Sequence, residues 1–275
     1  MIAETKKLLA ILAHPDDESM GMGGTLAKYA AEGVATYLVT ATRGEKGWFG
    51  AEAEYPGPQA LGEIRAAELD KAAEILGLQQ VSFLDAIDGE LDLAAPEEII
   101  AKLVHHIRSI RPQVVVTFDP SGYYGHPDHI AIAQFTQAAL VTAADPFYIS
   151  SGLDPAHRVD KLYYLAATAG TQAAYQAAFG DLVMNVDGVE RRAVAWPDWA
   201  VTTRIDASAY WQQAWQAIAS HRSQLPGYQK MLDLPEAYHR SLWGAQTFYR
   251  AYSLVNGGRA IESDLFMGVE EPVYA

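Results

Sequence analysis

The segment AHPDDE, residues 13–18, places an imidazole and three carboxylates directly after the apolar run LLAILA. Like charges this close repel, so the segment is either a solvated turn or the binding site of a cation. His14 and Asp17 are three residues apart, a spacing that lets both side chains reach one point from a single turn. A second cluster, HPDH, has the same spacing between His126 and His129. Two histidines and one carboxylate form a three-ligand set for a divalent metal, with a fourth position left for water.

The residue types also suggest how such a site would work. Zinc accepts this set, and Fe(II) also binds two histidines and one carboxylate, so both metals stay open. If Asp17 binds the metal, Asp16 can stay unligated and take a proton from the water that the metal activates. In HPDH, His129 points to the metal, while His126 stabilises an oxyanion or protonates a leaving amine. Asp128 would orient one of the rings, as carboxylates near metal-bound histidines commonly do.

The segment SGYYG precedes HPDH and is rich in glycine. Glycines on both sides would let Tyr123 or Tyr124 swing over a bound substrate. Glu18 is interpreted as a partner of the ligating residues, with no catalytic step of its own.

Composition restricts the class of protein. Half of the 275 residues are hydrophobic and 11% are aromatic, enough for a sizeable core. A net charge of −14 disfavours nucleic acid or an anionic membrane as a partner. The chain has no cysteine, so any metal must be held by nitrogen and oxygen ligands. No apolar run approaches the roughly 18 residues of a membrane span. We therefore expect a cytoplasmic protein, and the sequence leaves open a homo-oligomer.

The expected elements place these polar segments together. Expected strands are 8–13, 34–42, 81–85, 114–118 and 161–167, and expected helices are 25–32, 59–76, 96–110 and 128–143. Apolar strands alternating with helices predict an α/β fold with a mostly parallel sheet covered on both faces. Ligands bind such sheets beyond the carboxyl ends of the strands, which is where AHPDDE, TRGEKGW, DAIDGE and DPSGYYGHPDH follow. The less regular pattern of 168–275, with a helix expected over 206–221, predicts a C-terminal elaboration of one domain spanning 1–275.

These motifs resemble the LmbE-like, or PIG-L, deacetylase family. AHPDDE and GHPDH match its two hallmark segments, and TRGEKG, RAAEL and LDAIDGEL match supporting ones. The similarity covers about residues 7–167, and AIASHRSQ at 217–224 is similar to a more weakly shared segment. The resemblance implies a Rossmann-like fold and a zinc-dependent amidase that removes acetyl groups from N-acetylglucosamine-type substrates, here a small-molecule amino-sugar conjugate.

The resemblance also assigns residues to a metal centre and a base. By position it implies that His14, Asp17 and His129 are the metal ligands. It implies that Asp16 is the general base.

Further positions follow from the same resemblance. It implies that His126 stabilises the intermediate or protonates the amine and that Asp128 tunes it. Tyr124 matches a mobile tyrosine that polarises the scissile carbonyl. Arg65 and Asp88 match positions linked to contacts with the sugar or the active site. The residues alone leave other interpretations open: Arg65 as a helix-surface partner of a glutamate, and Asp88 as a turn residue before glycine.

A histidine and several aromatic residues outside these motifs could have either a functional or a structural role. His221, in HRSQ, has a structural role at least as readily as a functional one. Trp48 and Phe49, in a glycine-flanked loop, are candidates for substrate contact. Trp211 and Trp215, four residues apart on an expected helix, are better explained by core packing.

Two other functions compete with that of a deacetylase. A metal phosphoesterase commonly uses two metals bridged by carboxylates, whereas the sequence shows a single three-ligand set. A non-catalytic sugar-binding protein on the same fold would have no need of the base at Asp16.

Overall fold

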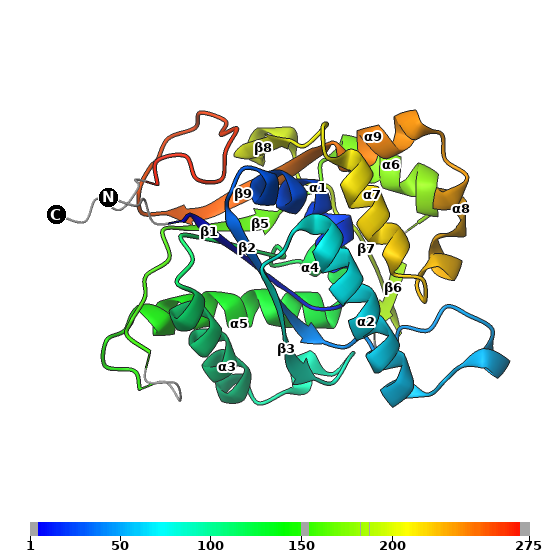
Figure 1. Ribbon diagram of the computed structural model, residues 1–275, viewed down its shortest axis with the longest axis horizontal. Coiled ribbons are helices and arrows are strands. Elements are labelled where there is room, and N and C mark those ends of the chain that lie inside the picture. The colour runs from blue at the N-terminus through cyan, green and yellow to red at the C-terminus, as the bar shows by residue number, and fades with distance from the viewer. Residues whose placement is uncertain (1–4, 150–153, 182, 187, 270–275) are drawn as a thin grey trace.

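The computed structural model describes residues 5–149, 154–181, 183–186 and 188–269, and a seven-stranded sheet runs through it (Figure 1). The strands, in spatial order, are β3 (Gln80–Ala86), β2 (Ala35–Thr42), β1 (Lys7–Leu12), β4 (Val114–Thr117), β5 (Lys161–Leu165), β9 (Ala245–Ser253) and β8 (Thr203–Asp206). The first five pair in parallel, and β9 and β8 pair antiparallel.

Helices cover both faces of this sheet. α1 (Asp17–Ala31), α2 (Pro58–Leu76) and α7 (Trp211–Ser220) pack together on one face, and α3 (Pro96–Ile110) and α5 (Pro127–Ala144) pack on the other (Figure 1). The central strands are apolar because both of their faces are covered, and Leu8 to Leu12 are fully buried. The predicted α/β fold with a mostly parallel sheet is therefore confirmed.

Smaller elements complete the described chain. They are α4 (Gly122–Gly125), α6 (Ala169–Phe179), β6 (Val183–Val186), β7 (Val189–Arg192), α8 (Gln229–Leu232), α9 (Glu236–Trp243) and the 3₁₀ turns η1 (Glu52–Glu54), η2 (Leu91–Leu93), η3 (Asp198–Ala200) and η4 (Leu225–Tyr228). β6 and β7 form a separate antiparallel hairpin, which contacts α4.

Two sequence-based boundaries are wrong. The first helix begins at Asp17 rather than at residue 25, because glycines in SMGMGG hide its helical pattern. These glycines allow close packing: a Cβ on Gly24 would lie 2.6 Å from the carbonyl oxygen of Trp243. The helix expected from residue 206 begins at Trp211, and residues 203–206 form β8 instead.

The strand order places a topological switch point between β1 and β4. These two parallel strands are neighbours, but the helices that follow them lie on opposite faces of the sheet. Ligands in open α/β sheets bind at such a switch point, beyond the carboxyl ends of the strands. AHPDDE follows β1 and the segment ending in HPDH follows β4, so the topology brings both clusters to this switch point.

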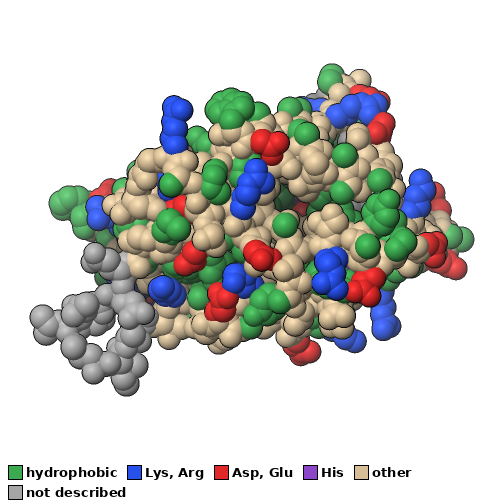
Figure 2. Space-filling view, turned by 90° about the horizontal axis from the view of Figure 1, so that it is seen from above, with side chains coloured by type: hydrophobic (Ala, Val, Ile, Leu, Met, Phe, Trp, Pro, Cys, Tyr) green, Lys and Arg blue, Asp and Glu red, His purple; other side chains and the backbone are tan. Residues whose placement is uncertain are grey.

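The surface is mixed in charge on the face shown in Figure 2, where Lys and Arg side chains are interspersed with Asp and Glu. Among the helices of the described residues, none is both long enough and apolar enough to cross a bilayer.

A buried ion pair joins the C-terminal part of the chain to the sheet. Lys161, on β5, is fully buried, and its Nζ lies 2.6 Å from Oε1 of Glu262. Arg250 also contacts Glu262, at 2.8 Å, and the hydroxyl of Tyr163 donates a hydrogen bond to it at 2.7 Å. Burial alone would raise the pKa of Glu262, but the bonds from Lys161 and its neighbours outweigh burial and lower that pKa from 4.5 to about 2.

We expect Glu262→Ala to lower the free energy of unfolding at pH 7 by about 3–5 kcal/mol, because it leaves Lys161 buried without its carboxylate. Because the pKa of Glu262 is lowered by folding, its stabilisation is complete above about pH 4.5 and is lost as the pH falls toward 2. The difference between variant and wild type should therefore shrink between pH 7 and pH 3 in urea-unfolding curves. Glu236→Ala, which breaks an exposed pair with Arg240, is the control and should change stability by less than about 1 kcal/mol. Equal effects of the two variants at pH 7 would contradict this prediction.

Candidate active site

Three donor groups converge beyond the carboxyl ends of β1 and β4. Nδ1 of His14 lies 3.2 Å from Nε2 of His129 and 3.6 Å from Oδ2 of Asp17. Nε2 of His129 lies 3.5 Å from Oδ1 of Asp17. Donors about 2.0–2.2 Å from a tetrahedral zinc ion lie roughly 3.3–3.6 Å apart. The separations here are close to that value, although Asp17 faces His14 with Oδ2 and His129 with Oδ1. The structure therefore brings together the three residues expected as metal ligands.

Local structure fixes these three side chains. Asp17 is the first residue of α1, and its Oδ2 accepts the backbone N–H of His14 at 2.8 Å. His129 lies in the first turn of α5, and its ring stacks on Phe118 at a centroid distance of 3.8 Å. His126 is the N-cap of α5 and Pro127 its first residue, a position that proline favours.

The carboxylates around His14 favour a positive charge on its imidazole. Burial disfavours its charged imidazole, but hydrogen bonds to Asp128 and Asp88 and the charge of Asp17 outweigh burial and raise the pKa of His14 to about 10. Burial, His14 and His126 together hold the pKa of His129 well below its ordinary value. A neutral imidazole among carboxylates is what a divalent cation requires of its ligands.

The outer nitrogen of His14 is held by two carboxylates. Its Nε2 lies 3.1 Å from Oδ2 of Asp128 and 3.2 Å from Oδ1 of Asp88. Asp128 also accepts the backbone N–H groups of Gly89 at 2.7 Å and Leu91 at 3.1 Å, which fixes the loop after β3. The resemblance implied that Asp128 tunes His126, whereas the structure places the Asp128 carboxylate against His14.

Among the described residues, two groups of possible metal ligands each have donor atoms that all lie within 4.8 Å of one another. They are His14, His126 and His129, and His14, Asp88 and Asp128. Both share His14 with the first triad. The second uses Asp128, whose oxygens already accept two backbone hydrogen bonds, so it is better suited to orient His14 than to bind a second metal.

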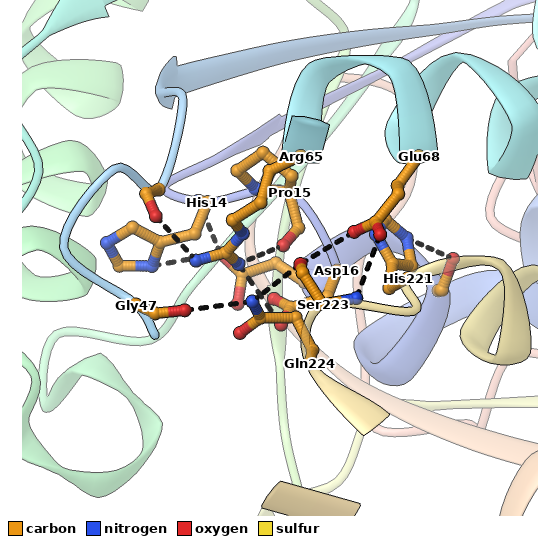
Figure 3. A network of polar contacts seen from close by, with 12 residues as sticks. His14, Pro15, Asp16, Gly47, Arg65, Glu68, His221, Ser223 and Gln224 are labelled. Carbon is orange, nitrogen blue, oxygen red and sulfur yellow. Dashed lines mark hydrogen bonds and ion pairs between the residues drawn. The ribbon is translucent and has the colours of Figure 1, made fainter. Parts of the chain in front are cut away.

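Asp16 lies beside the triad in an unusual backbone conformation. It precedes α1 with φ 116° and ψ −26°, and its side chain is nearly buried. Burial raises the pKa of its carboxyl, although the charge of Arg65 opposes this. Nη2 of Arg65 lies 3.3 Å from Oδ2 of Asp16 (Figure 3).

Arg65 faces the interior rather than the surface of α2. Only 3% of it is exposed, and it donates to the carbonyl oxygens of Pro15 and, at 2.9 Å, Gly44 (Figure 3). A Cβ on Gly44 or on Gly47 would lie 2.3 Å from Nη1, so these glycines leave room for the guanidinium. The interpretation of Arg65 as a surface partner of a glutamate is wrong. Its guanidinium instead links the segment after β1, through Pro15 and Asp16, to the segment after β2, through Gly44.

Tyr124 and His126 lie on the α4–α5 side of the triad. The ring of Tyr124 is 5.3 Å from that of His129, and the ring of His126 is 4.7 Å from that of His14. Burial and nearby Asp17 raise the pKa of Tyr124 well above its ordinary value, so its hydroxyl stays protonated. Burial and His14 lower the pKa of His126 to about 4.

The remaining candidates have different environments. His221 is 1% exposed, and its Nε2 lies 2.9 Å from Oε1 of Glu18. Phe49 is half exposed and packs against Gly227. Trp211 lies in a buried apolar cluster against which Trp215 packs, as expected.

Two contacts that position α4 have no sequence signal. Arg191, on β7, donates to the carbonyl oxygen of Gly125 at 3.0 Å. Nε1 of Trp196 donates to Asp119 at 2.6 Å, and the other oxygen of Asp119 accepts the N–H of Tyr123 at 3.0 Å. Arg191 lies on the β6–β7 hairpin and Trp196 follows it, in a part of the sequence with no recognisable motif, so only the fold reveals these contacts.

Comparisons with known proteins agree with this architecture. Residues 9–140 match the family model for PIG-L, GlcNAc-PI de-N-acetylase. A 1D-myo-inositol 2-acetamido-2-deoxy-alpha-D-glucopyranoside deacetylase of Kineococcus radiotolerans is 33% identical over 97% of this chain and 84% of its own length. The chain therefore belongs to the PIG-L (LmbE-like) family.

Solved structures share the fold. The conserved protein TT1542 of Thermus thermophilus superposes with a TM-score of 0.63 and 27% identity, covering 91% of this chain and 96% of that protein. The 4-carboxy-2-hydroxymuconate hydratase GalB of Pseudomonas putida superposes with a TM-score of 0.67 over 93% of this chain and all of that protein. GalB is only 20% identical, so it shows the fold alone.

We expect Asp128→Asn to weaken zinc binding by about 10–100-fold, because Asp128 orients His14 from behind. Competition with a chelator of known zinc affinity measures the effect. Asp92→Asn, at an exposed position in η2, is the matched control and should bind zinc like the wild type. Equal affinities of Asp128→Asn and wild type would show that Asp128 has no part in the metal centre.

Proposed function

We propose that this protein is a zinc-dependent hydrolase that removes the acetyl group from the amide nitrogen of an N-acetylglucosamine-type conjugate. The observation that carries the proposal is the buried convergence of His14, Asp17 and His129 at 3.2–3.6 Å, with Asp16 beside them. Nitrogen and oxygen ligands in this number leave an open position, as in catalytic zinc sites. Zn²⁺ held there would supply Lewis-acid chemistry, polarising the amide carbonyl and lowering the pKa of water to about 7.

Asp16 is the proposed general base. Its carboxylate takes a proton from the attacking water as the oxygen bonds to the carbonyl carbon. Burial supports this role because it raises the proton affinity of Asp16 above that of an exposed aspartate. Arg65 holds the carboxylate from the side, 3.3 Å away.

Tyr124 and His126 are proposed to stabilise the oxyanion. Tyr124 keeps its hydroxyl proton and can donate it in a hydrogen bond. Nδ1 of His126 accepts the backbone N–H of Asp128 at 3.1 Å, so the proton of the neutral ring lies on Nε2, which becomes a donor. Preorganised donors of this kind stabilise the negative charge of a tetrahedral intermediate.

Collapse of the intermediate breaks the carbon–nitrogen bond. The proton that Asp16 took from water passes to the amine nitrogen, and the products are acetate and a free amine. Two roles were open for His126: hydrogen-bond donor to the oxyanion, or acid that protonates the leaving amine. Its neutral ring, with the proton on Nε2, favours the role of donor to the oxyanion.

An N-acetylated amino-sugar conjugate is the proposed substrate class. The Kineococcus relative is named for deacetylation of an acetamido-glucopyranoside of myo-inositol. A phosphoesterase with two metals is less well supported, because the group His14, Asp88 and Asp128 shares His14 with the triad and so does not offer an independent second metal site.

The test is a screen for free-amine release from N-acetylglucosaminyl conjugates, including the inositol conjugate, with the zinc-loaded protein. We expect amine and acetate in equal amounts and one zinc per chain by elemental analysis. Two metals per chain with phosphoester cleavage, or zinc binding without amine release from any conjugate, would overturn the proposal.

We expect Asp16→Ala to keep zinc but to lose at least about 100-fold in kcat, because water loses its proton acceptor. His14→Ala, in contrast, should lose zinc itself. Steady-state amine release and metal content separate the two effects. Full activity of Asp16→Ala on the true substrate would contradict the assigned base.

We expect Tyr124→Phe to lower kcat by about 10²–10³-fold with a small change in KM, because one oxyanion donor is removed. Tyr123→Phe, at the adjacent position, is the matched control and should retain kcat within a few-fold. Steady-state kinetics on the same conjugate give both values, and the opposite order of effects would assign the role to Tyr123.

A further inference from the structure

Asp16 has a backbone conformation that residues other than glycine rarely adopt. Its φ of 116° lies in the region that favours glycine. A non-glycine residue persists there only when its surroundings fix it, and such strain concentrates at functional sites. The carbonyl oxygen of Asp16 accepts the N–H groups of Ser19 at 3.1 Å and Met20 at 2.9 Å, which fixes one side of the residue.

Glu18 fixes the other side. Its Oε2 accepts the backbone N–H of Asp16 at 3.0 Å, and its Oε1 lies 2.9 Å from Nε2 of His221. Glu18 is fully buried, and the hydroxyl of Ser19 also donates to Oε1. One carboxylate therefore links the backbone of Asp16 to a histidine that lies 203 residues beyond Glu18 in sequence.

His221 is itself held in place by its neighbours in HRSQ. It follows the last residue of α7, and Ser223 donates its backbone N–H to Oε1 of Glu68 on α2 at 2.8 Å. Nε2 of Gln224 donates to the carbonyl oxygen of Gly47 at 2.9 Å (Figure 3). The segment is thus anchored to α2 and to the loop after β2, and the imidazole is directed at Glu18.

We propose that Glu18 and His221 are positioning residues that hold Asp16 in its strained backbone conformation and so aim its carboxylate at the metal centre. The proposal rests on the proposed function, in which Asp16 is the base. A pair that merely joined α1 to α7 would not need to bond the N–H of Asp16. Because His221 fixes one oxygen of Glu18, the other oxygen stays directed at that N–H.

The first test compares Glu18→Gln, His221→Ala and His221→Gln in the zinc-loaded protein. We expect Glu18→Gln and His221→Ala to lower kcat by about 10–100-fold, with KM within about 2-fold and one zinc per chain retained. His221→Gln keeps a side-chain donor and should recover part of the lost kcat. His239→Gln is the matched control: His239 is also buried but bonds Trp243, and its variant should keep kcat at a comparable loss of stability.

A second test separates positioning from general damage. In the Asp16→Ala background, Glu18→Gln should cause no further loss of residual amine release, because no carboxylate remains to be aimed. A further loss as large as that in the wild-type background would overturn the proposal.

A third test does not depend on activity. Crystal structures of the metal-free wild type and of Glu18→Gln should show φ of Asp16 near 116° only in the wild type, with a longer Arg65–Asp16 contact in the variant. An unchanged Asp16 in Glu18→Gln would overturn the positioning role even if the wild type is an active deacetylase. Absence of deacetylase activity in the wild type would instead count against the proposed function, while the crystal structures still decide whether Glu18 holds Asp16.

Discussion

Carboxylates and imidazoles withdrawn from water at the carboxyl ends of β1 and β4 must each find a partner, because an unpaired buried charge is strongly destabilising. His14, Glu18 and Asp128 are all buried or nearly so. Their partners come from loops that would otherwise be free to move. Asp128 takes backbone N–H groups after β3, and Glu18 takes an imidazole from the end of α7. The same pairing that makes the charges tolerable therefore fixes the loops, and this keeps the donor groups in one geometry.

Much of this arrangement can be predicted from the sequence, because periodicity and local spacing act over short distances. The parallel strands are marked by apolar runs, and the ligand clusters by residues three positions apart. Contacts between distant segments are not marked in this way. The burial of Arg65 depends on a loop that supplies Gly44 and Gly47, and a helical arginine looks the same whether it faces water or a carboxylate. The early start of α1 is hidden because glycine lowers helix propensity while allowing the close packing that stabilises this helix.

The fold alone does not select the chemistry. The same fold occurs in a protein that is only 20% identical to this chain, and a fold by itself does not imply a function. Selection must come from side chains, and here it depends on two adjacent aspartates with different surroundings. Asp17 accepts the N–H of His14 and faces two imidazoles, whereas Asp16 faces a guanidinium. The two adjacent carboxylates therefore have different charged neighbours, and this difference is what would let them take different roles.

The part of the chain after residue 168 extends the sheet of the Rossmann-like core and contacts residues near the candidate site. β9 pairs with β5 and β8 pairs with β9, so removal of this part of the chain would expose the edge of β5. It would also leave Lys161 without Glu262, which follows β9. The same part supplies His221, whose ring contacts Glu18, and Arg191, which donates to the carbonyl oxygen of Gly125. A core ending at residue 167 would contain His14, Asp17 and His129 but would lack both of these contacts. The contacts around this cluster are therefore assembled from both halves of the sequence.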